Sequence, residues 1–216
     1  MSILAVGCSF TAGAELADPD QSAWPSLIAK LNNRSVKNLG LGGASNDRTF
    51  RLVVEETAKQ RFDLVIVQWT EPSRIEIWNE RIHQLVDVNV GKLYSQLPGF
   101  GWLDTYYQYH YSDLHAHKKW AIQILSLQGY LKSIEQPYVM VSLSGLDQPL
   151  YTGAWNNIKY LWDRVDEKYY PGWPFEGLYM WQGDCPRGPG GHPLELGHER
   201  MANKINEHIR NLGWLS

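Results

Sequence analysis

Along this 216-residue chain, short apolar runs alternate with longer segments whose apolar residues recur every three or four positions. The apolar runs predict strands over residues 2–6, 36–39, 63–68 and 138–143. Helices are predicted from residue 22, from residue 45 or 46, over 113–135 and over 194–211. Strands that alternate with helices form a parallel sheet through right-handed crossovers. We therefore expect an α/β fold, a three-layer α/β/α sandwich around a mainly parallel sheet, as a single domain of residues 1–216.

The segment from about residue 70 to residue 112 interrupts this alternation. It mixes Trp, Tyr, Pro and Gly and predicts a loop-rich aromatic insert. The whole chain holds 10 Trp and 12 Tyr, an unusually large aromatic content for its length. These rings either pack long loops onto the core or offer a stacking surface to a sugar or a flat acyl group.

Charge and hydropathy exclude several classes of partner. The net charge is −3 and no basic cluster is visible, so we expect no nucleic-acid partner. No apolar segment is long enough to span a membrane, and the first residues lack the basic start of a secretory signal. We expect a cytoplasmic protein without a membrane partner, with its two cysteines as free thiols.

Small and polar residues directly follow the first predicted strand, in the order Gly7-Cys8-Ser9-Phe10-Thr11. A serine there lies at the carboxyl edge of the sheet, where ligands bind in such folds. Small neighbours permit a tight turn and leave backbone N–H groups free for a developing oxyanion. Ser9 is therefore a candidate nucleophile, although a capping serine in an ordinary turn fits the same pattern.

A glycine-rich stretch, Asn38 to Asn46, follows the second strand. Its spacing is not that of a dinucleotide-binding loop, and we expect no cofactor. A bent loop that presents the N–H of Gly43 suits an oxyanion hole, whereas an ordinary turn capped by Ser45 is the simpler alternative.

The final predicted helix is preceded by Gly190-Gly-His192-Pro. A residue before proline does not fit mid-helix, so His192 belongs to a loop at the ligand-binding edge. A serine needs such a base to become nucleophilic. His198, within the helix, is expected to be solvated.

Together these blocks resemble, in order along nearly the whole chain, the SGNH hydrolase superfamily, also called GDSL-like lipases and esterases. The resemblance implies the flavodoxin-like sandwich of that family. It implies Ser9 as the nucleophile, with its own N–H in the oxyanion hole. It also implies Gly43 as the second oxyanion donor and His192 as the base.

The sequence departs from the family pattern at two supporting positions. Thr70 stands where the family has an asparagine that serves as third oxyanion donor, and the shorter Thr70 hydroxyl is the candidate donor in its place. Asn46 or Gln68 are the alternative substitutes. Pro189 stands where the family has an aspartate three residues before the histidine. Asp184 is the candidate replacement acid and Glu195 a weaker one. A Ser-His dyad oriented by a backbone carbonyl is the third possibility.

Several further residues are candidates for binding or chemistry. Three residues near the expected carboxyl edge of the sheet are candidates for substrate binding: Asn46, Trp69 and Glu71. Cys8 replaces the usual aspartate beside Ser9 and is an alternative nucleophile. His115 and His117 lie two apart on a predicted helix and so point to different faces, which argues against a metal site.

The prediction is therefore a serine ester hydrolase, an acyl-group or acetyl esterase, acting through a Ser-His dyad or triad. Its expected partner is a small-molecule ester, either simple or carbohydrate-linked. Two alternatives stay open: an acyltransferase that uses the same site, and an inactive binding or structural protein with this fold.

Overall fold

The structure is a computed structural model, which describes residues 2–88, 99–146 and 156–215. Four parallel strands form its sheet, in the order β2-β1-β3-β6. Their bounds are β1 Ser2–Val6, β2 Ser35–Asn38, β3 Leu64–Trp69 and β6 Tyr138–Ser142. The predicted parallel sheet is confirmed, and each strand begins and ends within one or two residues of its expected position.

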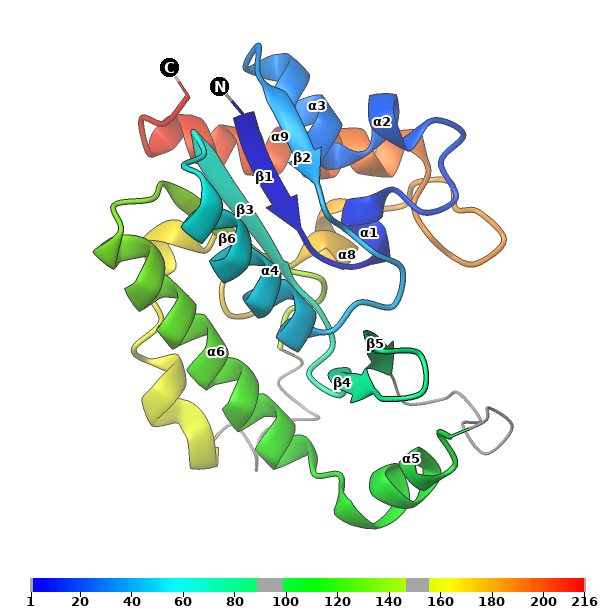
Figure 1. Cartoon of the computed structure of the whole chain (residues 1–216). Helices are drawn as coiled ribbons and strands as arrows, with labels where there is room; N and C mark the ends of the chain where they lie inside the picture. Colours follow the sequence, from blue (N-terminus) through cyan, green and yellow to red (C-terminus); the bar gives the residue numbers. More distant parts are fainter. Residues whose placement is uncertain (1, 89–98, 147–155, 216) are drawn as a thin grey trace.

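Helices cover both faces of the sheet, as Figure 1 shows. The longer helices are α3 Trp24–Leu31, α4 Asn46–Lys59, α6 Asp113–Ser133 and α9 Glu195–Asn211. Short helices are α1 Ser9–Ala12, α2 Pro19–Ser22, α5 Trp102–Thr105 and α8 Leu178–Trp181, with single turns η2 Tyr106–His110 and η3 Glu167–Tyr169. The three-layer α/β/α sandwich is therefore confirmed.

Alternate residues of each strand enter different layers of the core, because successive strand side chains point to opposite faces. In β1, Leu4 and Val6 pack with α4 and α6, whereas Ile3 and Ala5 pack with α3 and α9. All four side chains are buried. Burial on both faces explains why the strands read as continuous apolar runs.

The segment expected to be an irregular insert contains an antiparallel hairpin, β4 Ile75–Asn79 and β5 Gln84–Val88. Figure 1 shows it beyond the carboxyl end of β3, separate from the main sheet. The hairpin contacts α4 through Glu76: its carboxylate pairs with Arg51 of α4 at 2.6 Å, and its backbone N–H donates to the Asp47 carboxylate at 3.1 Å. The hairpin therefore lies at the edge where the strands end.

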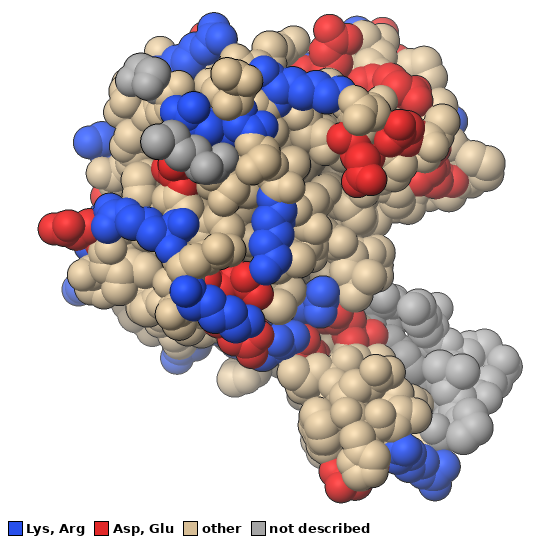
Figure 2. Space-filling model, turned by 45° about the horizontal axis from the view of Figure 1, so that its top comes forward, with Lys and Arg blue, Asp and Glu red and all other residues tan. Residues whose placement is uncertain are grey.

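Two surface findings bear on partners. None of the helices within the described residues is long and apolar enough to cross a membrane. On the face shown in Figure 2, Lys and Arg are interspersed with Asp and Glu.

Candidate active site

Ser9 begins α1 directly beyond β1 and is partly exposed. Gln68, fully buried at the end of β3, holds this turn in place: its Oε1 accepts the Cys8 N–H at 2.8 Å and the Thr11 hydroxyl at 3.1 Å. Gly7 permits the close approach, because a Cβ there would lie 2.3 Å from Thr11 Oγ1. Gln68 therefore positions the turn. Its Nε2 donates to the Trp69 carbonyl, so it does not fit the suggested role of substitute oxyanion donor.

Cys8 and Ser9 differ in accessibility. The Cys8 side chain is fully buried in the core layer under α3 and α9. Ser9 Oγ lies 4.0 Å from Cys8 Sγ. Ser9 is partly exposed at the edge of the sheet, whereas the Cys8 side chain packs in the core layer, so this geometry favours Ser9 over the alternative nucleophile. Cys185 is also a buried free thiol.

The glycine-rich loop packs directly on α1. Asn38 donates from Nδ2 to the Thr11 carbonyl at 2.7 Å and accepts the Gly40 N–H at 3.0 Å. A Cβ on Gly40 would lie 2.4 Å from the backbone nitrogen of Ala12, so only glycine fits there. Gly43 follows with a φ of 79°, in the left-handed region that favours glycine. The loop that carries the predicted second oxyanion donor thus lies against the helix that carries Ser9.

His192 lies beside the Ser9 turn. Its ring centroid is 5.9 Å from that of Phe10, the residue after Ser9. No hydrogen bond joins the Ser9 and His192 side chains, both of which the structure describes. His192 Nδ1 instead lies 2.9 Å from Glu15 Oε2, which leaves Nε2 as the nitrogen available to a serine.

Glu15 binds the histidine loop through three hydrogen bonds. Besides the imidazole, its carboxylate accepts the backbone N–H of His192 at 2.9 Å and the N–H of Gly190. The N–H groups of Gly190 and His192, followed by the imidazole, lower the pKa of Glu15 below its usual value. The side chain is ionised at neutral pH and faces the imidazole as an anion.

The sequence prediction missed Glu15, and the acid expected in its place lies elsewhere. Asp184 pairs with Arg200 at 2.8 Å, which lowers the pKa of Asp184, and its side chain is 96% exposed. The weaker candidate, Glu195, begins α9 and lines a groove on the outer layer. One signal pointed to Glu15: a carboxylate two residues after Gly13, in the loop that follows the serine turn.

Thr70 and Asn46 form a closed pair at the end of β3. Asn46 Oδ1 accepts the Thr70 N–H at 2.8 Å, and Asn46 Nδ2 donates to the Thr70 carbonyl at 3.0 Å. Because both ends of the Asn46 amide are engaged and the side chain is buried, it is not placed to bind substrate or an oxyanion. The Thr70 hydroxyl is buried without a hydrogen-bond partner among the described residues.

The two other candidate substrate-binding residues, Trp69 and Glu71, differ in exposure. Trp69 is fully buried, with its indole N–H directed at Met140 Sδ at 3.4 Å, so it belongs to the core. Glu71 is partly exposed and accepts the Ser144 hydroxyl at 3.1 Å. Glu71 is therefore the one of the three candidates, Asn46, Trp69 and Glu71, that the fold leaves open to a ligand.

Two further histidines are buried. His198, expected to be solvated, is fully buried, and its Nδ1 accepts the Trp24 N–H at 3.1 Å. Burial, and then the nearby charge of His192, lower the pKa of His198 to about 4. His117 is also buried, with Nδ1 2.8 Å from the Asp113 carbonyl.

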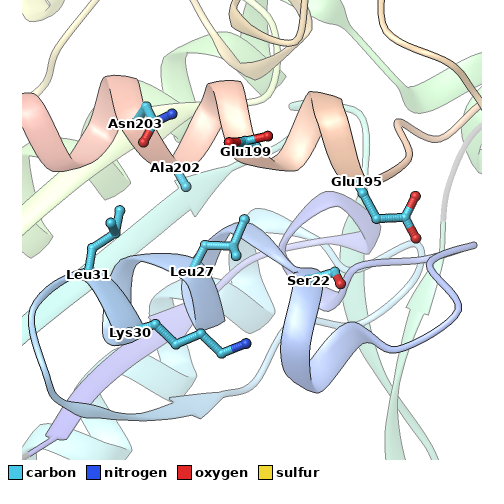
Figure 3. A pocket seen from close by; sticks show the side chains of 8 residues that line it. All are labelled: Ser22, Leu27, Lys30, Leu31, Glu195, Glu199, Ala202 and Asn203. Carbon is cyan, nitrogen blue, oxygen red and sulfur yellow. The ribbon is translucent and has the colours of Figure 1, made fainter.

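A groove of about 260 Å³ lies between α3 and α9, and neither Ser9 nor His192 lines it. Figure 3 shows leucines of α3 facing α9 across it, with a glutamate at one end. It is lined by Ser22, Leu27, Lys30, Leu31, Glu195, Glu199, Ala202 and Asn203.

No protein-family model matches the chain, and no curated protein sequence matches it. Solved structures do. A psychrotrophic esterase, EstA from Pseudoalteromonas sp., is 9% identical, with 98% of this chain and 97% of that chain covered and a TM-score of 0.59. A G-D-S-L family lipolytic protein from Veillonella parvula is 13% identical, with 96% and 97% covered and a TM-score of 0.51.

A family two carbohydrate esterase from Clostridium thermocellum, solved in complex with cellohexaose, is 13% identical. The similarity covers 99% of this chain and 65% of that chain, with a TM-score of 0.52. Likeness at such low identity concerns the fold. The strand order, the two helical layers and these structures agree: the chain has the fold of the SGNH (GDSL-like) hydrolase superfamily.

Proposed function

We propose that the chain is a serine esterase whose nucleophile is Ser9 and whose general base is His192, oriented by Glu15. The observation that carries the proposal is the contact between the Glu15 carboxylate and His192 Nδ1, beside the Ser9 turn. A carboxylate on one imidazole nitrogen fixes the tautomer and leaves the other nitrogen to accept a proton from serine.

In the proposed reaction, Ser9 Oγ attacks the ester carbonyl while His192 Nε2 accepts the hydroxyl proton. The imidazolium is stabilised by Glu15 and then donates the proton to the departing alcohol. Water, deprotonated by the same nitrogen, adds to the acyl-enzyme and releases the acid. The proton transfer requires Ser9 Oγ and His192 Nε2 to come within hydrogen-bond distance, and such contacts are often loose without substrate.

Three donors are assigned to the oxyanion: the N–H groups of Ser9 and Gly43 and the hydroxyl of Thr70. The proposal for Thr70 is supported by its buried hydroxyl, which has no acceptor among the described residues, and by the Asn46 clamp on its backbone. A buried donor without a partner is costly, and a substrate oxyanion would satisfy it.

The substrate proposed is a small or carbohydrate-linked ester, with the acetyl group as the simplest acyl group. Glu71 offers a carboxylate to a sugar hydroxyl. Tyr179, 44% exposed and 5.0 Å from the Phe10 ring, offers an aromatic face. The similarity to a carbohydrate esterase of the same fold supports this class. Transfer of the acyl group to a second alcohol instead of water would use the same residues.

One observation favours an alternative, a binding protein that has lost activity: Ser9 Oγ makes no hydrogen bond to the described His192 side chain and instead lies 4.0 Å from Cys8 Sγ. Labelling with a fluorophosphonate, followed by intact-mass measurement, distinguishes the two. The esterase forms one adduct on Ser9, and the adduct is absent from Ser9→Ala and His192→Ala. A folded wild type that forms no adduct would support the binding protein.

A further inference from the structure

The β4–β5 hairpin contacts the glycine-rich loop through one buried carboxylate. Asp87 in β5 accepts the backbone N–H of Ser45 at 2.8 Å. Ser45 is fully buried and caps α4, with its hydroxyl accepting the Arg48 N–H at 3.2 Å. Ser45 lies two residues after Gly43, so the hairpin holds the end of the loop that carries the second oxyanion donor.

The surroundings of Asp87 show that this contact is built into the fold. The Asp87 side chain is 10% exposed, and Arg48 Nε lies 3.9 Å away. Burial raises the pKa of Asp87, and the charge of Glu76 acts in the same direction, whereas Ser45 and Arg48 oppose it. The cost of burying this carboxylate is offset in part because it accepts the buried N–H of Ser45.

A second residue from the same segment reaches the same loop. Arg74, just before β4, donates from Nη1 to the Ala44 carbonyl at 3.4 Å. At its other end the loop is held by the Leu41 N–H, which donates to the Gly7 carbonyl at 3.1 Å. Gly43 lies between these anchors, so movement at Ser45 would turn the Gly43 peptide.

We infer that Asp87 is a positioning residue that fixes the Gly43 N–H for the oxyanion by holding the backbone of Ser45. The catalytic part of this inference rests on the proposed function. The structural part does not rest on it, because that part states only that the hairpin holds the backbone of residues 40–46 in a fixed conformation.

The test is amide hydrogen exchange of residues 40–46 in the full chain, for wild type, Asp87→Ala, Asp87→Asn and Glu80→Ala. Loss of one hydrogen bond to a charged group should raise exchange in Asp87→Ala by about 10-fold. Asp87→Asn keeps an acceptor oxygen and should stay near wild type. Glu80→Ala removes an acidic side chain from the exposed end of the same hairpin and should change nothing. Unchanged exchange in Asp87→Ala, or an equal rise in Glu80→Ala, would overturn the inference.

Asp87→Ala leaves Arg48 without its carboxylate, which can prevent folding. In that case the double variant Arg48→Met, Asp87→Ala is compared with Arg48→Met alone. Amide exchange of residues 40–46 should again be about 10-fold faster in the double variant. For the catalytic part, Asp87→Ala should lower kcat about 10-fold with little change in KM, and Asp87→Asn should restore it. A wild type that neither labels nor hydrolyses esters refutes the proposed function, while the exchange measurement still decides whether Asp87 holds the loop.

Discussion

Glu15 Oε2 lies 2.9 Å from both Nδ1 and the backbone nitrogen of His192, a residue 177 positions later in the chain. One carboxylate therefore fixes both the ring and the loop of the proposed base. The Glu15 carboxylate reaches the histidine from the loop after the serine turn, whereas Pro189 stands three residues before His192.

Replacing Glu15 with Gln should lower kcat by about 10²- to 10⁴-fold with little change in KM, because the amide can favour the wrong imidazole tautomer. Steady-state hydrolysis of a short aryl ester measures this. Asp184→Asn is the matched control and should stay within about 2-fold of wild type, since Asp184 contacts Arg200. An equal loss in Asp184→Asn would contradict the assignment of Glu15.

Thr70→Val should separate catalysis from stability. If the Thr70 hydroxyl serves the oxyanion, its loss lowers kcat by about 10²- to 10³-fold. The free energy of unfolding should stay equal or rise, because the hydroxyl that is removed is buried without a partner among the described residues. Urea titration and ester hydrolysis give the two values, and Thr70→Ser keeps the hydroxyl as a control. A stable Thr70→Val with full activity would remove Thr70 from the site.

Gln68→Met should loosen the serine turn. The Cys8 N–H and the Thr11 hydroxyl both lose their acceptor, so the free energy of unfolding should fall by about 1–3 kcal/mol. The rate of fluorophosphonate labelling at Ser9 should fall as well. Thr11→Val removes only one of the two bonds and should have the smaller effect on both. Labelling at the wild-type rate in Gln68→Met would show that Gln68 has no positioning role.

His198 should make stability depend on pH. Its folded-state pKa of about 4 lies below the usual value of 6.5, so the unfolded chain binds the extra proton between these values. Stability is therefore highest above pH 6.5 and falls as pH drops towards 4, with a contribution on the order of 3 kcal/mol. This contribution should be absent from His198→Asn, whose side-chain oxygen can accept the Trp24 N–H. Denaturant titrations across this range measure it.

The control for that series is His83→Asn, which replaces an exposed histidine. Its free energy of unfolding should depend on pH as that of the wild type does. The same slope in His198→Asn would show that the buried imidazole does not carry the effect.

Glycine, serine and proline positions predicted where two residues of the candidate site lie. Ser9 and His192 follow from where strands end and helices begin, which local sequence patterns report well. Trp69 was expected to bind substrate and His198 to be solvated, but both are buried. A polar or amphipathic residue at a sheet edge or on a helix can point either into the core or into solvent, so the prediction of exposure was wrong for both. The direction of such a side chain depends on neighbours far along the chain, such as Met140 and Trp24.

The parallel sheet, its two helical layers and the edge at which the serine and histidine lie were predictable from local patterns, because apolar periodicity is a property of consecutive residues. The partner of His192, the side chain that holds the serine turn, and the contact between the hairpin and the glycine-rich loop became known from the folded structure. Those contacts join Glu15 to His192, Gln68 to Cys8 and Asp87 to Ser45 across long sequence separations. They depend on how loops pack in space, and no local pattern of residues encodes that packing.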